Sequence, residues 1–217
     1  MKDGKTNAND MIAKIGILPV IAVPSPEAAV PLAAALVRGG IPAIEVTFRN
    51  PWAADAVAAI RATQPQMAIG AGTILKEEQI ATAKAAGADF LVSPGLDPDI
   101  VRTAMAAEIP IVPGVTNPSE ITAAVKLGLN VLKFFPAEIS GGIAALTLYH
   151  GPFPDVRFVP TGGMTFDNIG TYLAKPFVAA CGGSYMAKTP DIKAGAWDVI
   201  EANCRRCVEI ARAARGD

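Results

Sequence analysis

Residues 109–136 read IPIVPGVTNPSEITAAVKLGLNVLKFFP, and this stretch decides the fold class. It begins and ends with short apolar runs, IPIVPG and NVLKFFP, on either side of a segment that favours helix. The segment opens with Asn117 and Pro118, which is typical of a helix cap followed by a first-turn proline, and Gly128 stands where that helix should end. The stretch therefore predicts a strand, a helix and a second strand.

The same pattern recurs along the chain. Apolar runs rich in Val and Ile lie at 16–23, 42–48, 66–72, 89–94, 109–114, 130–136, 156–163 and 177–184. They are nearly continuously apolar instead of alternating, as expected for parallel strands that are covered on both sides. Eight βα units of about 20–30 residues each favour a (β/α)₈ TIM barrel over an open sheet.

Several of the intervening helices have recognisable limits. Asn50 and Pro51 form a second cap-plus-proline signal. Pro31 falls inside the first predicted crossover helix and leaves its early turns open. Glycines stand where helices should end, at Gly39, Gly40 and Gly87.

The composition fits one compact α/β domain that binds a small molecule. The 217 residues are 51% hydrophobic and 18% charged, which suits one buried core. The formal net charge is -1, and charges of both signs are scattered, so no basic face is expected for nucleic acid or an anionic membrane. We expect residues 1–217 to form a single barrel domain with an N-terminal helix.

Cysteine use favours a reducing compartment. Cys181, Cys204 and Cys207 are an odd set, so a disulfide framework is not expected. The CxxC spacing of Cys204 and Cys207 lies in a helical stretch, and His150 is the only histidine, so we expect no metal site. No apolar run reaches the length of a membrane span, and residues 1–16 lack the apolar core of a signal peptide. These features predict a cytoplasmic protein.

Lys133 is a charged residue inside the apolar sixth strand, between Leu132 and two phenylalanines. An unpaired ammonium is costly to bury, and the usual relief is a lowered pKa, which leaves a nucleophilic neutral amine. Two structural alternatives remain open. Lys133 either pairs with a core carboxylate, or extends its amine to solvent at the barrel mouth.

The second strand carries a polar row. Glu45, Thr47 and Arg49 alternate along it and therefore share one side, while the other side is apolar. Strands two and six lie across an eight-stranded barrel, so Glu45 and Lys133 should point into a shared space. An internal ion pair would explain this arrangement, but an acid, an amine and a guanidinium in one cavity are more often catalytic.

Two glycine-rich loops predict a phosphate site. PTGG at 160–163 follows the seventh strand, and GGS at 182–184 follows the eighth, the usual positions of a phosphate site in such barrels. Either pair of glycines alone could mark only a turn. Thr73, at the end of the third strand, offers a hydroxyl near Arg49 or caps the following helix. Pro94 shapes a tight turn after the fourth strand.

In this order the motifs resemble those of the bacterial 2-keto-3-deoxy-6-phosphogluconate (KDPG) and 4-hydroxy-2-oxoglutarate aldolases. They are EVTFR at 45–49, GAGT at 70–73, SPG at 93–95, KFFPAE at 133–138, PTGG at 160–163 and GGS at 182–184. The match extends from about Ile17 to Ser184 in one register and is more specific than any single motif. The resemblance implies a class I aldolase of carbohydrate metabolism, in the Entner–Doudoroff pathway. It also implies a homotrimer that needs no cofactor and no metal.

The resemblance also implies a role for each matching residue. Lys133 matches the Schiff-base lysine, and Glu45 matches the residue that moves protons. The expected substrate-binding residues are Arg49 and Thr73 at the pyruvate carboxylate, Pro94 and Phe135, Thr161 at the sugar hydroxyls, and Gly162, Gly163, Gly182, Gly183 and Ser184 at the phosphate. Threonine at 161 resembles the gluconate-type enzymes more than their galactonate-type relatives. Some members carry a basic residue at the end of the first strand, whereas this chain has VPS at 23–25.

We therefore expect reversible cleavage of KDPG to pyruvate and glyceraldehyde 3-phosphate. Cleavage of 4-hydroxy-2-oxoglutarate or of a galactonate-type 2-keto acid is the nearest alternative. A phosphate-binding barrel isomerase would need a carboxylate base but no essential amine. A non-enzymatic assembly subunit would bind no pyruvate.

Overall fold

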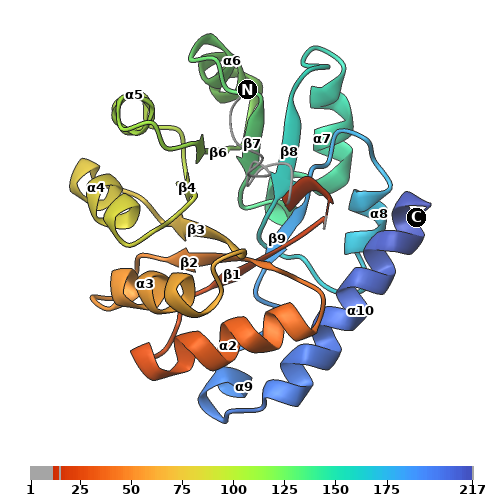
Figure 1. Ribbon diagram of the computed structural model, residues 1–217. Helices are drawn as coiled ribbons and strands as arrows, with labels where there is room; N and C mark the ends of the chain where they lie inside the picture. The colour runs from red at the N-terminus through yellow and green to blue at the C-terminus, as the bar shows by residue number, and fades with distance from the viewer. Residues whose placement is uncertain (1–11, 15, 217) are drawn as a thin grey trace, which may run out of the picture.

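The computed structural model describes residues 12–14 and 16–216, in which strands gather at the centre and helices surround them (Figure 1). The strands are β1 (Ile17–Ile21), β2 (Ala43–Thr47), β3 (Ala68–Gly72), β4 (Phe90–Val92), β5 (Ile111–Val112), β6 (Gly114–Val115), β7 (Val131–Phe134), β8 (Arg157–Pro160) and β9 (Cys181–Gly183). Each of the eight apolar runs contains at least one of these strands, which confirms their prediction.

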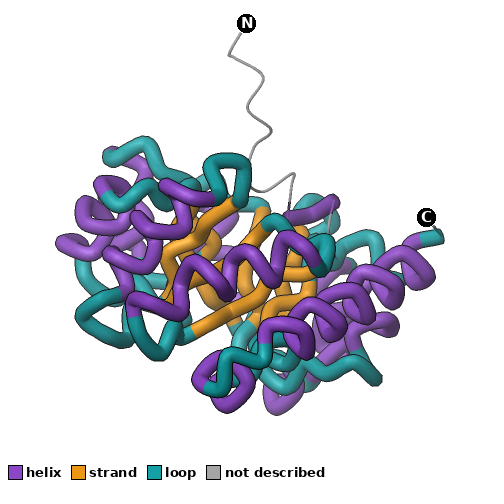
Figure 2. The backbone as a smooth tube through the Cα atoms, turned by 60° about the horizontal axis from the view of Figure 1, so that its bottom comes forward, coloured by secondary structure: helices purple, strands orange, loops and turns teal. Residues whose placement is uncertain are grey.

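The helices follow the strands in the predicted alternation. They are α2 (Pro26–Arg38), α3 (Ala53–Thr63), α4 (Glu77–Ala85), α5 (Pro98–Ala106), α6 (Pro118–Lys126), the 3₁₀ helix η1 (Glu138–Ser140), α7 (Gly142–His150), α8 (Ile169–Leu173), α9 (Thr189–Lys193) and α10 (Trp197–Arg215). Figure 2 shows helices lying over the strands from a second direction. Among the described residues, no helix is both long and apolar enough to cross a membrane.

The strands pair in parallel in two sheets. One has the order β5-β4-β3-β2-β1-β9, and the other has the order β6-β7-β8. Two isolated parallel bridges connect the regions of β8 and β9. Phe158 of β8 pairs with Val178, which precedes β9, and Thr161, directly after β8, pairs with Gly182 of β9. The predicted α/β class with a parallel, helix-covered sheet is confirmed.

The fifth predicted strand is divided at Pro113. Proline has no N–H to donate to a strand ladder, so β5 ends before it and β6 begins after it. The Pro113 carbonyl still accepts a hydrogen bond from the Lys133 N–H at 2.9 Å. This bond holds the backbone of Lys133 beside the divided strand.

Local signals predicted most helix limits. Asn117 caps α6 by accepting a hydrogen bond from the Glu120 N–H at 3.0 Å. Asn50 was expected to cap the helix after the second strand, and that prediction is wrong because α3 begins at Ala53. The Asn50 amide instead donates to the Val23 carbonyl at 3.0 Å. The Asn50 side chain therefore contacts a residue 27 positions earlier in the chain and does not cap a helix.

Two further predictions concern the first part of the chain. Helix α2 continues through Pro31, whose missing N–H would have paired with the carbonyl of Glu27 in the first turn. The predicted N-terminal helix is represented by residues 12–14, which are helical. The rest of that prediction lies outside the described residues.

The three cysteines are buried and unpaired. Burial raises the pKa of Cys204 and of Cys207 to about 12, so both stay as thiols near neutral pH. The described part of the chain contains no group of three or more His, Cys, Asp or Glu that could hold a metal ion. The two cysteines of the CxxC spacing are packing residues of α10.

Candidate active site

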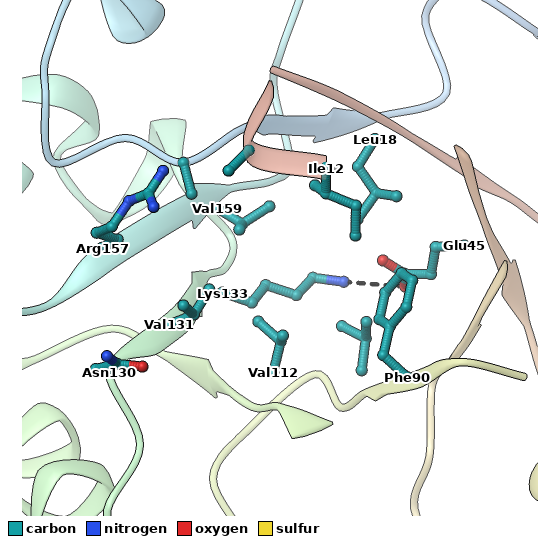
Figure 3. A pocket seen from close by; sticks show the side chains of 13 residues that line it. Ile12, Leu18, Glu45, Phe90, Val112, Asn130, Val131, Lys133, Arg157 and Val159 are labelled. Carbon is teal, nitrogen blue, oxygen red and sulfur yellow. Dashed lines mark hydrogen bonds and ion pairs between the residues drawn. The ribbon is translucent and has the colours of Figure 1, made fainter. Parts of the chain in front are cut away.

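Lys133 on β7 and Glu45 on β2 come from different sheets and meet in the buried interior. Lys133 Nζ lies 3.3 Å from Glu45 Oε1, and the two side chains are 8% and 1% exposed. Figure 3 shows the lysine extended toward the carboxylate, with apolar side chains around the contact. The ion pair satisfies both charges in an environment where either charge alone would be costly.

Glycine makes room for this pair. A Cβ at Gly72 would overlap the Glu45 carboxylate, so a larger residue on β3 would displace it. Lys133 Nζ also lies 5.3 Å from the centroid of the Phe135 ring, within the range of a cation–π contact. Thr47, the next residue of the polar row, is buried, and its hydroxyl has no hydrogen-bond partner among the described residues.

An inner cavity of about 230 Å³ lies against the pair (Figure 3). Its walls are largely apolar and include Leu18, Phe90 and Val112. Both Lys133 and Glu45 line it. The amine is therefore shielded from bulk water on this side.

An outer cavity of about 510 Å³ lies beyond the carboxyl ends of the strands. Alternate residues of the same strands line the two cavities in turn. On β8, Val159 lines the inner cavity, and Thr161, directly after the strand, lines the outer one. Lys133 of β7 lines the inner cavity, and Phe135, directly after β7, lines the outer one. The Lys133–Glu45 pair thus stands next to the floor of the outer cavity.

The outer cavity brings together most of the predicted substrate-binding residues. These are Arg49, Phe135, Thr161, Gly162, Gly163, Gly183 and Ser184. Of the described residues that line it, none is acidic, and the cations are Arg49 and Lys188. The cavity is electrostatically suited to a substrate with negative charge at both ends.

Arg49 is held by Thr73. Arg49 Nε donates to the Thr73 hydroxyl at 3.2 Å. The alternative role of Thr73 as a helix cap is wrong, because α4 begins at Glu77 and the Gln79 side chain accepts the N–H groups before it. Thr73 has a φ of +60°, a left-handed conformation that costs about 1–3 kcal/mol for a residue other than glycine. Such strain is common in functional sites.

The loop after β8 requires glycine. Gly162 and Gly163 have φ values of +94° and +86°, which side-chain-bearing residues rarely adopt. Gly182 does not line the outer cavity. It lies under Thr161, where a Cβ would overlap the threonine hydroxyl. Gly182 therefore makes room for Thr161 instead of facing a ligand.

Pro94 was predicted to bind substrate, but the structure does not place it at the outer cavity. It is half-buried and lines neither cavity. Its carbonyl oxygen lies where a Cβ of Gly114 would be. Pro94 thus shapes the contact between the turn after β4 and the start of β6.

Lys188 is the chemically important residue that the sequence did not reveal. It is exposed and lines the outer cavity with Ser184, and its ammonium makes no hydrogen bond or ion pair to another described residue. Phe166 and Tyr185, whose rings contact edge to face at 5.3 Å, form part of the same wall. The available signal was a lysine four residues after the GGS motif.

Comparisons with known proteins agree with this geometry. The family model for KDPG and KHG aldolase matches residues 8–203. The KHG/KDPG aldolase of Escherichia coli (strain K12) is 42% identical over 212 residues, which are 98% of this chain and 100% of that protein. The 2-dehydro-3-deoxy-phosphogluconate aldolase of Treponema pallidum is 43% identical over 201 residues, 93% and 96% of the two chains.

A solved structure adds a chemical comparison. The KDPG aldolase of Legionella pneumophila, with pyruvate captured at low pH as a covalent carbinolamine intermediate, superposes with a TM-score of 0.89. It is 40% identical, with 93% of this chain and 98% of that chain covered. Sequence motifs, fold and overall similarity therefore agree, and the chain belongs to the KDPG and KHG aldolase family of carbon–carbon lyases.

Proposed function

We propose that this protein is a class I aldolase that reversibly cleaves KDPG to pyruvate and glyceraldehyde 3-phosphate. The observation that carries the proposal is the 3.3 Å contact between buried Lys133 and Glu45 beside the outer cavity. The names of the relatives and the pyruvate adduct of the Legionella protein support the substrate class.

The first step joins the substrate to Lys133. Glu45 accepts a proton from the amine across their hydrogen bond, and the neutral amine attacks the keto carbon C2. The resulting carbinolamine loses its hydroxyl as water, using the proton that Glu45 returns. A protonated imine remains.

The second step breaks the carbon–carbon bond. Glu45 takes the proton of the C4 hydroxyl, the C3–C4 bond breaks, and its electron pair moves into the imine to give an enamine. The aldehyde leaves. Glu45 returns the proton to C3, and water then hydrolyses the imine, which releases pyruvate and frees Lys133.

The outer cavity orients the two ends of the substrate. Arg49, steadied by Thr73, binds the carboxylate next to the keto carbon. Thr161 contacts the sugar hydroxyls. The backbone N–H groups of the glycine loops and the hydroxyl of Ser184 bind the phosphate at the far end. Gly182 makes room for Thr161 from outside the cavity, and Pro94 shapes the turn after β4.

Imine trapping tests the proposal. Borohydride added with pyruvate is expected to attach a three-carbon adduct to Lys133, detected by peptide mass spectrometry. Lys133→Ala is expected to lose the adduct, whereas Lys126→Ala, at an exposed site on α6, keeps it. Undiminished trapping by Lys133→Ala would rule out this lysine. An isomerase or an assembly subunit would give no adduct in the unmodified protein.

A second candidate activity is cleavage of 4-hydroxy-2-oxoglutarate to pyruvate and glyoxylate. The family description and the name of the E. coli relative couple the two activities. The same imine chemistry applies to both substrates. Galactonate-type cleavage is a less favoured substrate choice, because threonine occupies position 161.

We further infer that residues 1–217 form one closed (β/α)₈ barrel. Two observations support closure. Only Pro113 separates β5 from β6, and two bridges connect the β8 and β9 segments. The two sheets would then be parts of one barrel.

We also infer a homotrimer that acts in the cytoplasm, in the Entner–Doudoroff pathway. Membership of the family supports the assembly and the pathway. Ile139 and Leu148, on η1 and α7, are 87% and 75% exposed and are candidates for burial between subunits. Three unpaired cysteines agree with a reducing compartment.

A further inference from the structure

We propose that Glu138 and Tyr172 are positioning residues that hold the phosphate-binding loop at 161–163 in its binding conformation. Neither residue lines the outer cavity, so both act through the loop. The inference rests on the proposed function for its kinetic consequence, although the contacts themselves do not depend on it.

Backbone hydrogen bonds connect η1 with the loop. The Ala137 N–H donates to the Thr161 carbonyl at 2.8 Å, and the Glu138 N–H donates to the Gly162 carbonyl at 3.2 Å. The segment that directly follows the reactive strand β7 therefore lies against the loop that follows β8. Displacement of Glu138 would move the loop with it.

The side chain of Glu138 packs on the same loop. A Cβ at Gly163 would lie 2.7 Å from Glu138 Cβ and still closer to its Cγ, so only glycine fits against this side chain. Gly162 and Gly163 are both in left-handed conformations, which offer many backbone alternatives. A loop of this kind needs external contacts to keep one conformation.

Tyr172 on α8 fixes the Glu138 carboxylate. The Tyr172 hydroxyl donates to Glu138 Oε1, and the tyrosine is only 2% exposed. Burial, together with the hydrogen bond to Glu138, raises the pKa of Tyr172, so the hydroxyl keeps its proton and remains a donor. Glu138 itself is exposed, and without this bond its side chain would be free to turn into solvent.

The side chain of Glu138, on η1, thus contacts both the loop at 161–163 and α8. A Cβ at Gly142 would lie 3.0 Å from the Tyr172 oxygen and 3.3 Å from Glu138 Oε1. The first residue of α7 therefore also packs against the Tyr172–Glu138 hydrogen bond. Loss of the hydrogen bond should loosen the phosphate end of the site. Arg49, Thr73 and Glu45 belong to the β2 and β3 region, and Lys133 is held inside β7 by its contact with Glu45. The carboxylate end and the Lys133–Glu45 pair should therefore be unaffected.

Kinetics with matched substrates test the proposal. Tyr172→Phe and Glu138→Ala are each expected to raise KM for KDPG about tenfold, with kcat within about twofold, because a hydrogen bond to a charged group is lost. KM for unphosphorylated 2-keto-3-deoxygluconate should rise less, by no more than about twofold, because that substrate keeps only the hydroxyl contact of Thr161 with this loop. Glu138→Gln should behave like the unmodified protein, because its amide oxygen accepts the same bond. The double variant Glu138→Ala/Tyr172→Phe should be no worse than either single change.

Tyr149→Phe is the matched control. The Tyr149 hydroxyl donates to the Thr116 carbonyl at 3.3 Å, away from the loop, and its removal should leave both KM values unchanged. An equal rise of KM for both substrates in Tyr172→Phe, or no rise for either, would overturn the proposal.

A binding measurement separates this inference from the proposed function. Titration with inorganic phosphate, followed through the NMR signals of the Gly162 and Gly163 amides, should show about tenfold weaker binding in Tyr172→Phe. If the unmodified protein binds phosphate in this way but does not cleave KDPG, the proposed function fails and the positioning role stands. If phosphate affinity and both amide signals are the same in Tyr172→Phe, the positioning role fails.

Discussion

At the scale of single residues, the proposed chemistry depends on two opposite charges placed in an apolar interior. Lys133 and Glu45 are 88 residues apart in the chain and 3.3 Å apart in space. Each is the other's buried partner, so the pair can exchange a proton without moving through solvent. The catalytic and structural explanations for these residues are therefore compatible, because one contact serves both.

Removal of the charge on Glu45 tests its part in this pair. Glu45→Gln is expected to lose turnover by about 10²-fold or more, because an amide cannot take the proton of the C4 hydroxyl. The variant should still form the trapped imine with pyruvate, since Lys133 remains, but more slowly, because Glu45 no longer carries the protons of that step. Steady-state cleavage of KDPG measures the first effect, and borohydride trapping measures the second. Glu209→Gln, at an exposed site on α10, is the control. Full turnover in Glu45→Gln would exclude it as the acid–base group.

At the scale of elements, the ends of different strands supply different parts of the site. Arg49 follows β2, Thr73 follows β3, and the glycine loop at 161–163 follows β8. Gly183 is the last residue of β9, and Ser184 follows it. The strands are short and rigid, so each end holds its residue in a defined place. Lys188 comes from the loop before α9 and adds a cation at the mouth of the outer cavity.

Lys188 is expected to favour phosphorylated substrates. Lys188→Gln should lower kcat/KM for KDPG about two- to fivefold at low ionic strength, which is the effect of an exposed ion pair. The loss should shrink as salt is added, because exposed charges are screened. Cleavage of 2-keto-3-deoxygluconate should not respond. Lys193→Gln, at the other end of α9, provides the comparison. Equal losses for both substrates would refute an electrostatic role.

At the scale of the whole molecule, the C-terminal helix ties together segments from both ends of the chain. The Arg215 guanidinium donates to the carbonyls of Ala13, Lys14 and Ala179, the second at 3.4 Å and the third at 2.8 Å. These carbonyls precede β1 and β9, which are paired neighbours in the sheet. Arg215 therefore stabilises the place where the first and last strands meet.

Loss of this contact should reduce stability but not chemistry. Arg215→Ala is expected to lower the free energy of unfolding by about 1–3 kcal/mol, because charged hydrogen bonds are lost and half-buried carbonyls are left unpaired. Urea denaturation with an unchanged m-value measures this loss, and kcat should stay the same. Arg212→Ala, three residues earlier on an exposed face of α10, should have little effect. A similar loss in both variants would indicate a general charge effect.

The order of strands and helices, the caps at Asn117 and Gly128, and the family could all be predicted from the sequence. Each depends on neighbours in the chain: apolar runs drive strand burial, and caps act within one helical turn. The polar row at Glu45 and the lysine at 133 were visible for the same reason, since both interrupt a local apolar pattern.

Only the tertiary structure decided the remaining features. Asn50 bonds to Val23 instead of capping a helix, Thr73 supports Arg49, and Tyr172 reaches Glu138. The chain positions in these contacts are 24 to 34 residues apart. Such pairs leave no local pattern, because the free energy of each hydrogen bond depends on a partner that folding brings near. The sequence by itself therefore determined where Lys133 lies along its strand, and the packing of distant elements determined what surrounds it.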